Sequence, residues 1–104
     1  MKITLIALAA LLSMQGVSAA GWSPITKVTA VYPNSDGNIY GNNLANYNPD
    51  SCVSAQSVIL SKNLAKKEIY TAVLAAKISN SNINFYMSGC LGGTYPIVLN
   101  VQVL

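Results

Sequence analysis

The side chains that could do chemistry in this chain are mostly amides, hydroxyls and phenols. The 104-residue sequence has no histidine, and its only carboxylate side chains are Asp36, Asp50 and Glu68. Without histidine the commonest general base and metal ligand is missing, and neither a Ser-His-Asp nor a Cys-His arrangement can be built. The three acids fall in a predicted turn, loop and helix, where a solvated role is the simplest interpretation. We therefore expect a protein that is not an enzyme and holds no cofactor or metal.

Amide and phenol side chains gather around one predicted strand and its loops. The asparagines in this region are Asn34, Asn38, Asn42, Asn43, Asn46 and Asn48. Tyr40 and Tyr47 lie nearby in the sequence, and Tyr86 and Tyr95 lie on other predicted strands. Neutral glycans are recognised by groups that both donate and accept hydrogen bonds, and by flat rings against the sugar face. Two interpretations stay open: a glycan surface that includes Tyr40, or the ordinary use of asparagine in turns. Trp22, the only tryptophan, either packs at the edge of the core or offers a stacking surface.

Residues 1–19 have the pattern of a secretory signal peptide. Lys2 precedes an apolar run at 3–12, and small residues lead to a cleavage point after Ala19 or Ala20. The run is too short to span a bilayer, and no later run is longer; it is apolar all round, which disfavours a retained amphipathic anchor. We expect residues 20–104 to form a single domain that is secreted or periplasmic, with no membrane span.

Charge and cysteine content narrow the possible partners further. The net charge is +3, or +2 without Lys2, and it is scattered and lacks arginine. Nucleic-acid binding depends on a dense basic surface that displaces counterions, so we expect no nucleic acid. Cys52 and Cys90 most simply form one disulfide in an exported chain. Two free thiols, or a metal-ligand pair without further ligands, are the alternatives.

The pattern of apolar residues predicts one helix among short strands. In the helix, predicted over 63–78, Ile69, Ala72, Val73 and Ala76 recur at helical spacing, and Asn63 is placed to cap its first turn. Strands are predicted at 25–32, 38–43, 56–60, 82–88 and 95–104, with the first two joined as a hairpin by the turn at 33–37. On the fourth strand Ile83, Phe85 and Met87 share a face. On the fifth, Ile97, Leu99, Val101 and Val103 are predicted to share one.

The predicted order is β-β-β-α-β-β, a mostly β fold with one helix. This is the order of an OB-fold, a five-stranded Greek-key barrel with a helix between its third and fourth strands. An α+β sandwich and an open meander with a helix across one face are the rivals.

Short motifs in this order resemble a known group of toxin subunits. They are Gly21-Trp22, the hairpin V-Y-P-N-S-D-G-N-I-Y, the helix K-E-I-Y-T-A-V-L-A-A-K, the strand I-N-F-Y-M-S-G-C and the tripeptide T-Y-P at 94–96. They look like the binding subunits of AB-type toxins of the subtilase-cytotoxin and pertussis-like typhoid-toxin kind. The resemblance implies an OB-fold subunit that assembles as a homopentameric ring, binds host-cell glycans and carries an enzymatic A subunit, which would make it a virulence factor.

The resemblance also implies site residues. The family's glycan site uses a serine just before the first strand, whose counterpart is Ser23, and a tyrosine after the helix, for which Tyr86 is the nearest match. With Trp22 and Tyr40, these are the candidate ligand-binding residues. In a ring, Lys66, Lys67 and Lys77 would face the central pore and meet an acidic tail of a partner; a solvated basic helix face is the alternative.

Two functions are therefore expected. The first is an exported glycan-binding module of the toxin B-subunit kind. The alternative is a periplasmic or secreted protein-binding or inhibitor module that acts as a monomer or dimer.

Overall fold

The chain folds as a mostly β structure with one helix in its described part. The computed structural model describes residues 20–42, 47–54 and 56–104, so the predicted signal peptide, Asn43 and Asn46 lie outside it. The elements are β1 (Gly21–Trp22), β2 (Val31–Pro33), β3 (Ile39–Gly41), β4 (Ser57–Ile59), α2 (Lys66–Ser79), β5 (Ile83–Leu91) and β6 (Tyr95–Val103). Over these residues the structure contains no helix with the length and apolar character that crossing a bilayer requires.

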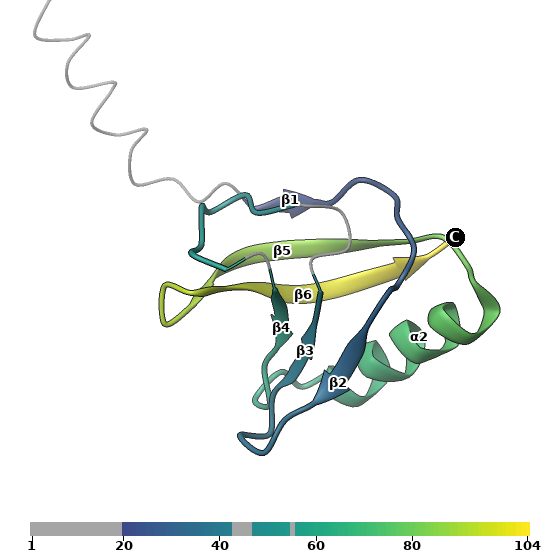
Figure 1. The fold of residues 1–104 in the computed structure, drawn as a ribbon, viewed down its shortest axis with the longest axis horizontal. Helices are drawn as coiled ribbons and strands as arrows, with labels where there is room; N and C mark the ends of the chain where they lie inside the picture. The colour runs from purple at the N-terminus through teal and green to yellow at the C-terminus, as the bar shows by residue number, and fades with distance from the viewer. Residues whose placement is uncertain (1–19, 43–46, 55) are drawn as a thin grey trace, which may run out of the picture.

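The strands form one six-stranded mixed sheet in the order β1-β5-β6-β4-β3-β2 (Figure 1). β4 and β6 run parallel, and the other neighbours are antiparallel. The described sheet is not closed, and β1 and β2 are its two edges. Both edges come from the segment 21–33, whose middle is tied to β5 by two backbone hydrogen bonds of 2.9 Å between Thr26 and Ile83. The predicted first strand is therefore divided between two partners.

The predicted hairpin is confirmed, with β2 and β3 antiparallel across the turn at 34–37. The Gly37 N–H donates to the Asn34 carbonyl oxygen at 3.0 Å, and Gly37 has a φ of +85°, a conformation that favours glycine. The Asp36 side chain accepts from the Asn38 N–H at 2.9 Å. These bonds set the register that places Tyr32 directly opposite Tyr40.

Helix α2 begins three residues later than predicted. Asn63 Oδ1 accepts from the Ala65 N–H at 2.9 Å, and the Asn63 carbonyl oxygen accepts from the Lys66 N–H at 3.0 Å, so Asn63 closes a turn before the helix. At the other end Asn80 is left-handed, with a φ of 54°. The predicted inward face is confirmed at Ile69, Val73 and Ala76, which are buried.

The core lies between α2 and one face of the sheet. It contains Ile39, Ile59, Ile69, Val73, Ala76, Ile83, Phe85, Met87 and Val98. The predicted inward face of Ile83, Phe85 and Met87 is confirmed.

The predicted face on β6 is wrong in part. Asn100 pairs with Tyr86, but Val98 pairs with Met87, so Leu99 is an extra residue in the ladder. This β-bulge reverses the alternation: Val98 enters the core, and Val101 packs against it. Leu99 is left exposed.

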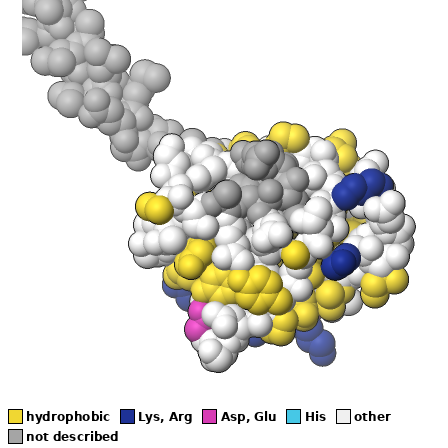
Figure 2. Space-filling model, viewed as in Figure 1, with side chains coloured by type: hydrophobic (Ala, Val, Ile, Leu, Met, Phe, Trp, Pro, Cys, Tyr) yellow, Lys and Arg dark blue, Asp and Glu magenta, His cyan; other side chains and the backbone are white. Residues whose placement is uncertain are grey.

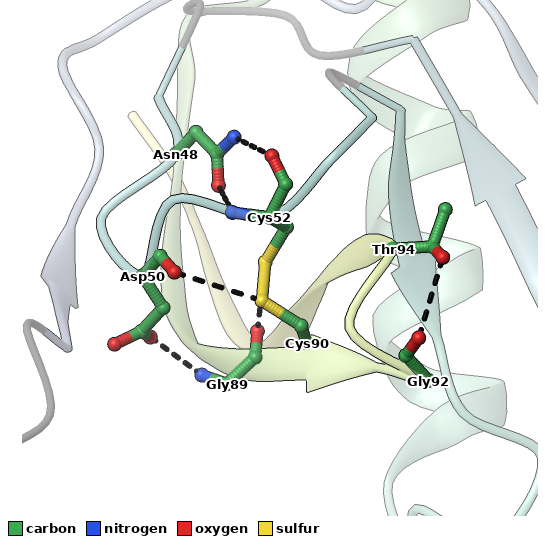
Figure 3. Close-up of a disulfide and its surroundings, with 7 residues drawn as sticks. All are labelled: Asn48, Asp50, Cys52, Gly89, Cys90, Gly92 and Thr94. Carbon is green, nitrogen blue, oxygen red and sulfur yellow. Dashed lines mark hydrogen bonds between the residues drawn. A yellow bond between two sulfur atoms is a disulfide. The ribbon is translucent and has the colours of Figure 1, made fainter.

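The predicted disulfide between Cys52 and Cys90 is present, with the two Cα atoms 5.7 Å apart. Polar side chains hold the segment around it (Figure 3). The Asn48 amide accepts from the Cys52 N–H at 2.8 Å and donates to the Cys52 carbonyl oxygen at 2.7 Å. Asp50 accepts from the Gly89 N–H at 2.6 Å. The segment 47–54 is thereby fixed against the end of β5.

Candidate functional site

Three of the four predicted ligand-binding residues come together where β1 meets β5. Trp22 is paired with Tyr86, their ring centroids are 5.5 Å apart, and the rings meet edge to face at 68°. Trp22 remains 46% exposed, and Tyr86 is half-buried. β1 is an edge strand of the described sheet.

An amide continues this row on the other side of Tyr86. Asn100 on β6 is the cross-strand partner of Tyr86, and directly opposed residues of antiparallel strands share a face. Asn100 is exposed. Trp22, Tyr86 and Asn100, which we call the edge row, thus place an indole, a phenol and an amide side by side. They lie on the face away from the core, since Phe85 and Met87 on either side of Tyr86 point inward.

Ser23 lies beside the edge row but is buried, with 5% of its surface exposed. Its N–H donates to the Phe85 carbonyl oxygen at 2.7 Å, and its hydroxyl oxygen accepts from the Phe85 N–H at 2.9 Å. The hydroxyl donates to the Pro24 carbonyl oxygen at 3.0 Å. In this arrangement Ser23 positions the end of β1, and a direct contact between its hydroxyl and a ligand stays a prediction.

The disulfide-bonded segment 47–54 also contacts β1. A Cβ added to Gly21 would lie 2.7 Å from the Tyr47 hydroxyl, which shows how closely the tyrosine approaches β1. Tyr47 also packs against the core. The segment that carries it is the one that Asn48, Asp50 and Cys52 fix against β5. Trp22 therefore sits on a strand that is held both by Ser23 and by Tyr47.

Tyr40, the fourth predicted residue, belongs to a different group of rings. We call Tyr32, Tyr40 and Tyr95 the tyrosine cluster. Tyr32 and Tyr40 are stacked, with centroids 5.9 Å apart and an interplanar angle of 23°, and Tyr95 meets Tyr40 edge to face at 5.1 Å. Tyr40 is only 7% exposed, whereas Tyr32 is 42% exposed. Figure 2 shows hydrophobic side chains in a broad band beside the acidic side chain near the β2–β3 hairpin.

Two polar side chains form hydrogen bonds with the tyrosine cluster. The Tyr40 hydroxyl donates to Asp36 Oδ2 at 2.7 Å, and the Gln56 amide donates to the Tyr32 hydroxyl. The bond from Tyr40, with that from the Asn38 N–H, lowers the pKa of Asp36 below its usual value. The same carboxylate raises the pKa of Tyr40, because it stabilises the protonated phenol. Asp36 is therefore an anion and Tyr40 a neutral phenol at neutral pH.

The three predicted pore lysines lie on α2 without converging on one site. Lys66 Nζ donates to the Gly37 carbonyl oxygen at 3.4 Å, which brings one ammonium group to the β2–β3 turn. Lys67 and Lys77 are exposed at opposite ends of the helix. Their contact with a partner's acidic tail stays a prediction.

One small pocket lies beside the core in the described part of the chain. It has a volume of about 20 Å³ and is partly open, and it is bordered by mainly apolar side chains and by the Ser57 hydroxyl, which has no hydrogen-bond partner among the described residues. A volume of this size suits a single water molecule. This pocket is therefore too small to hold a sugar ring. Within the described ranges no three His, Cys, Asp or Glu residues gather in a way that could hold a metal ion.

Sequence reasoning missed Asn100, Tyr32 and Gln56. Two signals were available for the first two. Asn100 alternates with apolar residues of a predicted strand. Tyr32 and Tyr40 lie equally far from Asp36 within the predicted turn, which is the spacing of opposed residues in a hairpin centred there. Gln56 reaches Tyr32 from another strand, and no local pattern marks that contact.

Comparisons of this chain with protein-family models, with curated proteins and with solved structures find no match.

Proposed function

We propose that this protein is an exported, non-enzymatic binding module that recognises glycans through the edge row. The observation that carries the proposal is the indole of Trp22, which is 46% exposed although its strand is firmly held. Sugar rings present C–H groups that pack on aromatic faces, and their hydroxyls pair with amides and phenols. Tyr86 and Asn100 supply these groups on adjacent strands. A preformed site of this kind loses little entropy when a ligand binds.

An OB-fold-like Greek-key barrel is part of the proposal. The order of the strands supports it, since the segment 21–33 contacts β5 near its start and β3 at its end. The parallel pairing of β4 with β6 also fits a barrel in which the helix precedes the last two strands. The resemblance to toxin B subunits extends the proposal to a ring-shaped homopentamer that carries a toxic A subunit and presents α2 toward that partner.

The test is binding of the mature protein to a panel of immobilised glycans, compared with the variants Trp22→Ala and Asn100→Ala. Removal of the indole should weaken binding about fivefold, because one stacked ring contributes on the order of 1 kcal/mol. Ile25→Ala is the matched control, since Ile25 is 60% exposed on the same segment and lies outside the row. Equal binding by Trp22→Ala and Ile25→Ala, or no binding by the folded parent protein, would refute the proposal.

A second function, protein binding as a monomer or dimer, has less support. Leu64 and Ile78 are apolar and almost fully exposed at the two ends of the helical region. Exposed apolar side chains mark protein contacts when they gather in patches, and here they are separate. Light scattering distinguishes the two functions: a ring of several subunits supports the toxin-like module, and a monomer or dimer supports the alternative.

A further inference from the structure

We infer that the tyrosine cluster is a second glycan-binding surface, separate from the edge row. The inference extends the proposed function, because it takes the ligand class from it. Trp22 and Tyr86 lie on β1 and β5, whereas Tyr32 and Tyr40 lie on β2 and β3, at the opposite edge of the described sheet. One chain would then hold two parts of a branched or clustered glycan.

The arrangement of the rings suits a sugar platform. Tyr32 lies on the outermost strand of the described sheet, and its ring is stacked on Tyr40, which is almost fully buried. Tyr95 packs edge to face on Tyr40, so the ring beneath Tyr32 is held from two sides. Tyr32 is therefore a half-exposed ring on a rigid base, and little entropy is lost when a flat ligand packs against it.

The polar groups around the cluster match sugar hydroxyls. The Asp36 carboxylate, an acceptor, lies at the Tyr40 hydroxyl, and the Gln56 amide lies at the Tyr32 hydroxyl. Lys66 Nζ reaches the neighbouring turn at Gly37 and adds a donor. A hydroxyl group both donates and accepts, so it can pair with each of these groups.

Two other ligand classes fit less well. A peptide could extend the sheet at β2, but Pro33 has no N–H for such a ladder, and proline at an edge strand blocks pairing. A cationic group could lie on the tyrosine rings beside Asp36, but the ammonium group of Lys66 already sits next to this turn and would repel it. A largely neutral sugar meets neither obstacle.

The test uses the same glycan panel with four proteins: the parent, Trp22→Ala, Tyr32→Ala and the double variant. Binding that survives in Trp22→Ala should fall about fivefold when Tyr32→Ala is added, since one stacked ring contributes on the order of 1 kcal/mol. Tyr32→Phe keeps the ring and should stay within about threefold of the parent. Leu64→Ala, a change at an exposed apolar side chain away from both surfaces, controls for general effects. Thermal unfolding of each variant shows that it is folded, and chemical shifts of the Tyr32 ring report the contact independently.

Each outcome decides the tyrosine cluster, the edge row or both. Glycan binding that is lost with Trp22 alone, with unchanged Tyr32 shifts, overturns the second surface and leaves the edge row in place. Binding that is lost with Tyr32 and not with Trp22 supports the tyrosine cluster and overturns the edge row. A parent protein that is folded and binds no glycan overturns both.

Discussion

Replacement of Ser23 by alanine separates a structural from a ligand-binding role for its hydroxyl. In the structure this hydroxyl accepts the Phe85 N–H at 2.9 Å, in a place where both residues are buried. Alanine has no acceptor to replace the Ser23 hydroxyl. The Phe85 N–H would lose its partner while it stays buried. Of the two hydrogen bonds between Ser23 and Phe85, only the one from the Ser23 N–H to the Phe85 carbonyl oxygen would remain.

The magnitude follows from the cost of a buried donor without a partner, roughly 1–3 kcal/mol. A change of 1 kcal/mol shifts the melting temperature of a domain of this size by about 4–8 °C. We therefore expect Ser23→Ala to lower the melting temperature by roughly 5–20 °C. Glycan binding should weaken only as far as Trp22 becomes less well positioned.

The assay is thermal and urea unfolding, followed by the fluorescence of Trp22, alongside glycan binding at a temperature where the variant is folded. Ser61→Ala is the control, because Ser61 is exposed and bonds to Asn38 through its backbone N–H. An unchanged melting temperature with abolished binding would refute the reasoning, since the hydroxyl would then serve the ligand. An unchanged melting temperature with intact binding would equally contradict the assigned bond.

Two further predictions concern the disulfide and Asp36. The double variant Cys52→Ser, Cys90→Ser should lose about 4 kcal/mol in urea unfolding, because the bond closes a long loop in the unfolded chain; equal stability of the two proteins would contradict this. The pKa of Asp36 is lowered on folding, so its contribution to stability is present above the usual aspartate value of about 3.9 and is lost as the pH falls through the folded pKa. Asp36→Asn should therefore flatten the stability profile between about pH 5 and pH 2, measured by urea unfolding, and a profile identical to the parent's would show that the Tyr40 bond is not linked to pH.

The elements with regular local patterns could be predicted from the sequence. The alternation of Ile83, Phe85 and Met87 gives the inward face of β5, and the spacing of Ile69, Val73 and Ala76 gives that of α2. Two cysteines in a chain that is predicted to be exported were sufficient to predict the disulfide. Each of these features depends on neighbouring residues or on general chemistry, so a single sequence is sufficient for it.

The features that could not be predicted depend on distant parts of the chain. The bulge at Leu99 exists because β6 must fit β5, and nothing within the strand marks it. Asn63 caps a preceding turn instead of α2, a choice between two nearly equivalent local bonds. Tyr40 was grouped with Trp22, Ser23 and Tyr86 by residue type, but the order of the strands places it at the other edge of the described sheet. Residue types and the resemblance to toxin subunits identified the candidates, and the topology decided which of them meet.

The pairing of β1 with β5 affects the order in which the chain can complete its fold. Trp22 and Tyr86 are paired although most of the domain's sequence lies between them. Closing so long a loop is slow and costs entropy. A ribosome releases β1 long before β5 exists, whereas β5 and β6 are joined by a short turn and can pair as soon as both are made. The indole is therefore among the last groups to find its place, and its fluorescence reports the closing step of folding.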